Sequence, residues 1–174
     1  MSFVIPANVC YPSDAGLLGK GVRRLTRLVG QVKAAGLAKR TSFRDRTLSC
    51  RRRAHAIGAW LRRRSDEAKD EVLEITAEMV NIAEAALGEA TVVARNARRS
   101  LKAKGDAASA GAHKKLGELD QMIATLSKVV AQTRIRVSGG MPEGSTRIVS
   151  LHDTDARPIR KGRLGRPVEF GYKA

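Results

Sequence analysis

Three carboxylates near the C-terminal end have residue types that could bind a divalent metal. Asp153 and Asp155 alternate within a predicted turn, and Glu169 lies further along the chain. Alternating acids can supply oxygen ligands to one metal ion. Basic residues surround the two aspartates: Arg157, Arg160 and Lys161. Because acids beside bases in a loop form solvated ion pairs worth at most about 1 kcal/mol, we expect neither a metal site nor a catalytic residue here.

Histidine and cysteine offer little further chemistry. His55, His113 and His152 are far apart in the sequence, and none has a partner at metal-binding spacing. His55 stands among arginines, so we expect its side chain to be solvated. Cys10 and Cys50 are not spaced as metal ligands, and we expect both to be free thiols.

Basic residues form the stronger candidate site. Residues 1–64 hold 15 Lys and Arg against two acids, whereas residues 65–137 hold 11 of each sign. The triplets 51–53 and 62–64 are eleven residues apart, which is three turns of a continuous helix, so they would share one face. Such an excess favours contact with the phosphates of a polyanion, and a solvated helix face is the alternative. The residues predicted to bind DNA are Lys20, Arg23, Arg24, Arg27, Arg51, Arg52, Arg53, Arg62, Arg63 and Arg64.

A smaller basic patch near the C-terminal end consists of Lys161, Arg163 and Arg166. Gly162 and Gly165 would let the backbone turn tightly and approach a phosphate, but a plain hairpin turn explains them equally well. The sequence has no glycine-rich nucleotide loop, zinc finger or helix-turn-helix pattern. We therefore expect electrostatic, non-specific DNA binding without base readout.

Apolar periodicity predicts three helices, over residues 13–36, 43–104 and 110–138. The second helix would be roughly 90 Å long at about 1.5 Å per residue. Sustained heptads of this kind favour coiled-coil packing. The stripes expected to be buried are Leu18, Val22, Leu25, Val29 and Val32 in the first helix; Ala54, Ile57, Leu61, Ala68, Val72, Ile75, Met79, Ile82, Ala86, Ala90, Val93, Ala97 and Leu101 in the second; and Leu116, Leu119, Ile123, Leu126, Val130, Thr133 and Val137 in the third.

The helix lengths suggest one arrangement. The first helix would fold back on the first half of the long helix, and the third helix on its second half. Segments 4–9 and 147–151 would then meet and pair as short strands, with a further strand at 168–172. We expect a mainly α chain, in which a long antiparallel coiled-coil hairpin is inserted into a partial sheet of two or three short strands.

Composition limits the environment of the chain. No apolar run is long enough to span a membrane, and residues 1–11 lack the basic flank and apolar stretch of a signal peptide. We expect a cytoplasmic protein with no membrane partner. Open helical stripes and an unfinished sheet edge favour self-association.

Two segments resemble parts of one protein family. Val149–Ala174, which contains His152-Asp-Thr-Asp155 and ends in Pro167-Val-Glu-Phe-Gly-Tyr-Lys173, resembles a segment of bacterial insertion-sequence DDE transposases. Val4–Leu18, with its Tyr11-Pro-Ser-Asp14 turn, resembles the segment that follows the first catalytic aspartate in that family. The two segments cover roughly a quarter of the chain.

The resemblance implies an RNase H-like core interrupted by a helical insertion. Residues 1–11 would be the remnant of the first core strand, 12–140 the insertion, and 141–174 the start of strands two and three. The family cuts DNA with three acids and two Mg²⁺ ions. Met1 stands where the first aspartate belongs, and Ala174 precedes most of the other acids. This implies a truncated, inactive transposase fragment with no cofactor of its own.

Two other hypotheses stay open. The chain could be a free-standing basic coiled-coil module that binds nucleic acid or another helix. It could also be an active enzyme, which is disfavoured because the resemblance assembles no acid triad.

Overall fold

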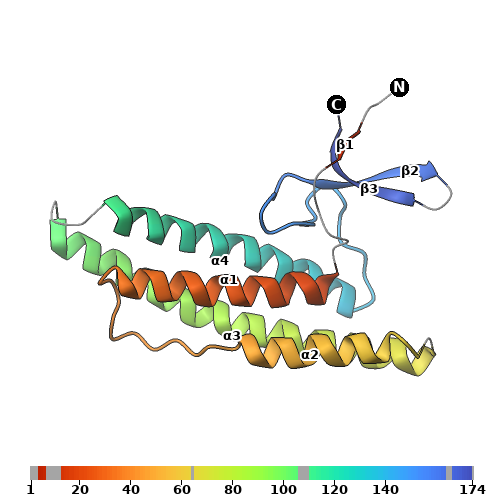
Figure 1. Cartoon of the computed structure of the whole chain (residues 1–174), viewed down its shortest axis with the longest axis horizontal. Coiled ribbons are helices and arrows are strands. Elements are labelled where there is room, and N and C mark those ends of the chain that lie inside the picture. The colour runs from red at the N-terminus through yellow and green to blue at the C-terminus, as the bar shows by residue number, and fades with distance from the viewer. Residues whose placement is uncertain (1–3, 7–12, 64, 106–109, 164–165, 174) are drawn as a thin grey trace.

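The computed structural model describes residues 4–6, 13–63, 65–105, 110–163 and 166–173. Within these ranges the chain forms four helices and three strands, with the strands at one end of the helical part (Figure 1). The helices are α1 (Asp14–Ala34), α2 (Thr47–Trp60), α3 (Asp66–Lys104) and α4 (Ala110–Val137). The prediction of a mainly α chain is confirmed.

Local signals explain where α1 and α4 begin and end. Ser13 caps α1, because its side-chain oxygen accepts a hydrogen bond from the amide of Gly16 at 3.1 Å. The helix ends before Gly36, whose φ of 83° suits glycine. α4 ends before Gly139, which has a φ of 85°. Both helices lie within the predicted ranges of 13–36 and 110–138.

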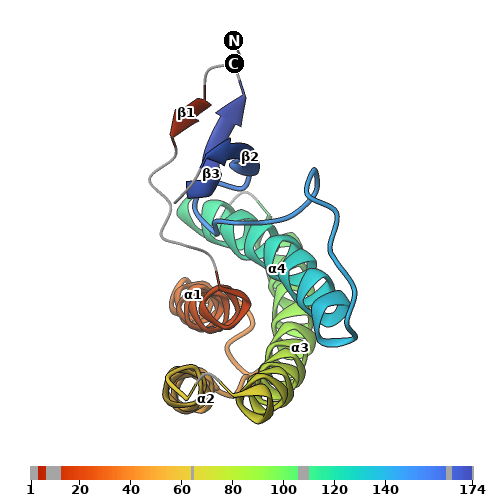
Figure 2. The same ribbon diagram turned by 90° about the vertical axis from the view of Figure 1, so that its right-hand side faces the viewer.

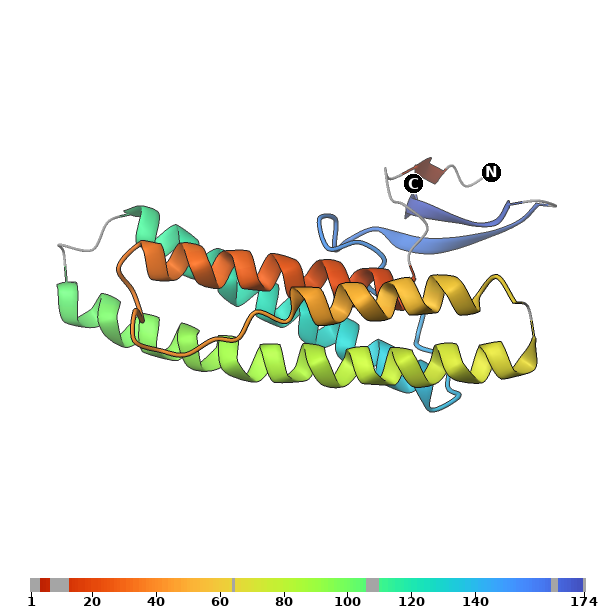
Figure 3. The ribbon, with the colours of Figure 1, turned by 60° about the horizontal axis from the view of Figure 1, so that its bottom comes forward.

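The predicted continuous helix over 43–104 is wrong. Its first part is α2, and the chain then turns so that α3 runs back beside α2 (Figure 3). The missed signal is Ser65, whose side-chain oxygen accepts from the amide of Ala68 at 3.1 Å. Asp66 and Glu67 occupy the first turn of α3, where acids favour the positive end of the helix dipole. The seven-residue spacing of Leu61 and Ala68 continued the apolar stripe across this turn and hid it.

The core lies between α1, α3 and α4 (Figure 2). The predicted stripe of α1 is fully buried, and on α3 and α4 the stripes are buried or partly buried. Buried alanines on α3 let the helices approach closely, as does buried Gly21 on α1. Two members of the predicted long stripe are exposed: Ala54, and Leu61 with 62% of its surface accessible. Both lie in the part of the chain where the continuous helix was wrongly predicted.

The strands form one antiparallel sheet in the order β1-β3-β2. β1 (Val4–Pro6) pairs with β3 (Arg166–Lys173), which pairs with β2 (Arg157–Arg163). The sheet lies on the side of α1 and α4, away from α2 (Figure 2). A strand was correctly expected at 168–172, but the pairing of segment 4–9 with segment 147–151 was wrong, because β1 pairs with β3 instead.

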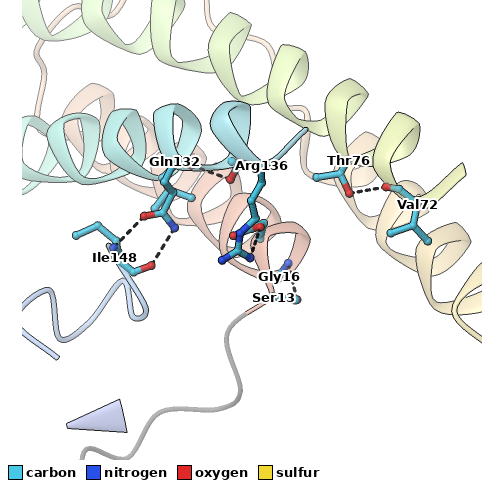
Figure 4. A network of polar contacts seen from close by, with 10 residues as sticks. Ser13, Gly16, Val72, Thr76, Gln132, Arg136 and Ile148 are labelled. Atoms are coloured by element: carbon cyan, nitrogen blue, oxygen red, sulfur yellow. Dashed lines mark hydrogen bonds and ion pairs between the residues drawn. The ribbon is translucent and has the colours of Figure 1, made fainter. Parts of the chain in front are cut away.

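Segment 147–151 is not a strand because helix side chains bind its backbone. The amide of the Gln132 side chain makes two hydrogen bonds to Ile148, and Arg24 donates to the carbonyl of Leu151 at 2.8 Å. Ile148, Val149 and Leu151 are buried. Figure 4 shows the Gln132 contact together with Arg136 at the end of α4. These contacts fix the chain between α4 and β2 to the helical core.

None of the helices in the described part of the chain is both long and apolar enough to pass through a bilayer. Cys50 is a free thiol, as predicted, and it is buried. Cys10 lies outside the described residues.

Candidate nucleic-acid interface

The predicted basic residues separate into three groups in the structure. Lys20, Arg23 and Arg27 are exposed on α1, and Arg51 and Arg52 are exposed on α2. Among the described residues these five side chains have no acidic partner, so they face solvent. They form the available part of the predicted DNA-binding set.

The second group has structural partners. Arg53 forms an ion pair with Glu78 of α3, with 2.5 Å between Nε and Oε2. Arg24 is half-buried and donates to the carbonyl of Leu151. The donors of each guanidinium are partly engaged within the fold. Contact of either arginine with a phosphate would have to use the guanidinium donors that these bonds leave over.

The third group consists of the predicted residues that belong to neither α1 nor α2. Arg62 and Arg63 lie in the turn after α2, so the predicted common face with residues 51–53 is wrong. The guanidinium of Arg63 sits over the ring of Trp60, 4.1 Å from its centre. Arg64 lies outside the described residues. Lys161, Arg163 and Arg166 belong to β2 and β3, and their side chains lie outside the described part.

The reversal between α2 and α3 brings acidic residues close to the basic residues of α2. Residues 66–78 hold six acids and one base, and the turn places this acidic stretch beside basic α2. The Arg53–Glu78 pair is one result. The side of α2 that faces α3 is therefore partly neutralised, whereas the side that faces α1 is not.

A groove lies between α1 and α2, with a volume of about 260 Å³. The two helices run side by side in opposite directions (Figure 3). The groove brings Lys20 and Arg23 of α1 together with Arg51 of α2, as the sequence predicted for the first helix lying alongside the second. Its lining residues are Ala15, Gly16, Gly19, Lys20, Arg23, Thr47, Cys50, Arg51, Ala54 and His55.

His55 was expected to be solvated, and it is exposed, but it also lines this groove. The signal that could have placed it there is its spacing of four from Arg51, which sets both on one face of α2. Cys50 lies at the base of the groove with 1% of its surface exposed. Burial raises the pKa of its thiol, and the nearby charge of Arg53 opposes that shift. The thiol is therefore poorly suited to act as a nucleophile.

The only two acids of residues 1–64 have partners outside the groove. Asp14 forms an ion pair with Arg136 of α4, with 2.7 Å between Oδ2 of Asp14 and Nη1 of Arg136. Asp45 accepts a hydrogen bond from the amide of Thr47 at 2.8 Å, and its contacts with Thr47 lower its pKa. Neither carboxylate lines the groove. The groove thus keeps a positive charge.

The C-terminal acids form no metal cluster within the described residues. Oδ1 of Asp153 accepts hydrogen bonds from the amides of Asp155 and Ala156, at 3.3 and 3.2 Å, which is the geometry of a turn. A larger hollow of about 720 Å³ lies between α4 and segment 142–157. Its charged lining residues are of both signs: Lys128, Glu143, Arg147, Asp155 and Arg157. This mixture does not favour a polyanion.

No protein-family profile, curated protein or solved structure gives a match to this chain.

Proposed function

We propose that the chain is part of a DDE-type transposase and that its helices bind duplex DNA without sequence preference. The observation that carries DNA binding is the exposed basic surface of α1 and α2, which consists of Lys20, Arg23, Arg27, Arg51 and Arg52. Its charges come from two antiparallel helices and face solvent. Phosphate neutralisation by such a surface supplies affinity without base readout.

The transposase assignment rests on the resemblance of the two end segments. The arrangement of the strands supports it, because Val4 in the first segment is paired with Lys173 in the second. A sheet interrupted by a helical insertion requires this kind of long-range pairing. We propose that β1, β2 and β3 belong to an RNase H-like sheet and that the helices form its insertion.

We further propose that this stretch binds DNA and does not cut it. The turn geometry of Asp153 supports this, because its carboxylate already accepts two backbone amides. The test is incubation with supercoiled plasmid and Mg²⁺ or Mn²⁺. Nicking that survives repurification and disappears in Asp153→Ala would contradict the proposal.

A second candidate is a free-standing interaction module that pairs with another helix. Exposed leucines at the two ends of α2 favour it, since Leu48 in the helix and Leu61 just after it are 58% and 62% accessible. This candidate expects concentration-dependent association in sedimentation and weak binding to DNA. The transposase proposal expects tight binding to DNA whether or not the chain self-associates.

DNA binding is tested by neutralising the basic surface. The five residues of that surface are changed together to Gln, which keeps helix propensity. Fluorescence anisotropy with unrelated duplexes should show weaker binding to all of them. The slope of log K against log salt should fall by about 0.9 for each phosphate that the variant no longer neutralises.

The matched control for this variant removes five exposed bases from α3 and α4: Arg95, Arg99, Lys102, Lys114 and Lys128. It changes the net charge by the same amount but leaves the basic surface intact. We expect it to bind more tightly than the first variant. Equal binding by the parent and the first variant would reject DNA binding through α1 and α2.

A further inference from the structure

The basic residues on the two sides of α2 have different surroundings. Toward α3, Arg53 is paired with Glu78 at 2.5 Å. Toward α1, Arg51 and His55 line the groove together with Lys20 and Arg23. The acids nearest in the sequence, Asp14 and Asp45, have partners outside the groove. Of the five residues of the basic surface, Lys20, Arg23 and Arg51 therefore line the groove, and neither acid of this part of the chain does.

The groove also has room for a ligand between its charged walls. Its inner lining includes small residues, among them Gly16, Gly19 and Ala54. A Cβ atom added at Gly19 would come no closer than 3.8 Å to Met79, so this part of the groove is not tightly filled. A phosphate group could enter without displacing a large side chain.

We infer that the α1–α2 groove seats the backbone phosphates of one DNA strand. This inference rests on the proposed function and adds the place where the strand lies. Lys20, Arg23 and Arg27 follow one another at spacings of three and four on α1, a row of about 10 Å. Successive phosphates of one strand are separated by more than their rise of about 3.4 Å along the duplex axis, and a row of this length spans more than one phosphate of the strand.

The length of this row distinguishes a strand from smaller anions. A free phosphate or a lipid headgroup would be held by a single cluster, such as Arg23 with Arg51. Arg27 extends the basic row past the groove, since it is exposed but does not line it. A strand that enters the groove would continue along α1 toward Arg27.

The test compares variants that remove the same amount of charge inside and outside the groove. Arg23→Gln with Arg51→Gln changes two groove residues, whereas Lys39→Gln with Arg40→Gln changes two exposed residues of the α1–α2 connection that neither line the groove nor belong to the basic row. A third variant, Ala54→Phe, fills the groove and leaves the charge unchanged. Ala54 is exposed, so this substitution adds bulk outside the core. Far-UV circular dichroism checks that each variant keeps its helices.

Binding to a labelled duplex is measured by anisotropy at several salt concentrations. We expect the groove pair to weaken binding about tenfold more than the pair outside the groove and to lower the salt slope by about 1.8, which corresponds to two phosphate contacts. Ala54→Phe should weaken binding severalfold and also lower the salt slope, because a strand kept out of the groove loses its phosphate contacts there.

Two outcomes would reject the groove as the place where the strand binds, without rejecting DNA binding itself. One is equal weakening by the two charge pairs, and the other is full binding by Ala54→Phe. If neither charge pair weakens binding, both the groove and the proposed function fail. Inorganic pyrophosphate and vesicles of phosphatidylglycerol serve as the other phosphate sources. Loss of vesicle binding in Ala54→Phe with unchanged DNA binding would assign the groove to a headgroup and reject the inference.

Discussion

The side-chain amide of Gln132 pairs with both backbone groups of Ile148. Its Nε2 donates to the carbonyl oxygen at 3.0 Å, and its Oε1 accepts from the amide nitrogen at 2.9 Å (Figure 4). Both residues are buried. Gln132 thus takes the place that a neighbouring strand would have, and it ties the segment before β2 to α4.

Replacing Gln132 with Met should destabilise the protein by about 2 to 3 kcal/mol, because two buried backbone groups of Ile148 would then have no partner. Met keeps the approximate size of the side chain. Gln121→Met is the control, since Gln121 is exposed on the same helix and should change stability by less than about 0.5 kcal/mol. Urea denaturation followed by circular dichroism measures both. Equal effects of the two variants would show that the Ile148 contact is not stabilising.

The sequence predicted the helices better than their connections. The stripe of α1 was found correctly because its spacing of three and four residues continues without interruption and all its members are buried. The turn between α2 and α3 was missed because Ile57, Leu61 and Ala68 keep a helical spacing across it. The cap at Ser65 was the competing local signal, with two acids after it. Periodicity alone does not detect a chain reversal that preserves the apolar register.

The α2–α3 reversal predicts a short distance between residues 53 and 78. In a continuous helix these positions would be about 38 Å apart at 1.5 Å per residue. The ion pair between Arg53 and Glu78 brings their side chains into contact instead. Spin labels at Arg53→Cys and Glu78→Cys, with both native cysteines replaced, should give an electron–electron distance well below that value. A distribution centred at about 38 Å would instead support a continuous helix over these residues.

Part of the candidate interface could also be predicted from sequence. The charge excess of residues 1–64 is visible in composition, and it marked α1 and α2 correctly as the basic helices. Which arginines remain available could not be predicted, because it depends on partners brought close by folding. Arg53 meets Glu78 only after the chain reverses, and Arg24 meets the carbonyl of Leu151 from the far end of the chain.

Glu89 holds the connection between α1 and α2. One carboxylate oxygen accepts from the guanidinium of Arg46 at 2.6 Å, and the other from the backbone amide of Arg44 at 2.7 Å. The hydrogen bond from Arg46 is the main cause that lowers the pKa of Glu89 in the folded protein. In the unfolded chain a glutamate has its ordinary pKa of about 4.3.

A lowered folded-state pKa means that Glu89 stabilises the fold at pH values above about 4.3, and that this stabilisation disappears as the pH falls through the folded-state value. Glu89→Gln should therefore cost about 1 kcal/mol at pH 7, a figure reduced for the partial exposure of the pair. The difference from the parent should shrink as the pH falls below about 4. Thermal unfolding from pH 3 to pH 7 measures it, with exposed Glu74→Gln as the control. A difference that stays constant with pH would contradict this role.

Gly21 and Gly30 on α1 provide a matched test of the contact between α1 and α4. A Cβ atom at Gly21 would lie 2.5 Å from Cδ1 of Leu126, which is fully buried and has little room to move, whereas a Cβ at Gly30 would meet nothing within 4 Å. Alanine favours a helix interior by about 1 kcal/mol over glycine, so Gly30→Ala should stabilise the protein by up to that amount. Gly21→Ala gains the same propensity but overpacks the core, and we expect a net destabilisation of about 1 kcal/mol. Urea denaturation of both variants decides the matter: stabilisation by Gly21→Ala equal to that by Gly30→Ala would mean that α1 and α4 are not in close contact at Leu126.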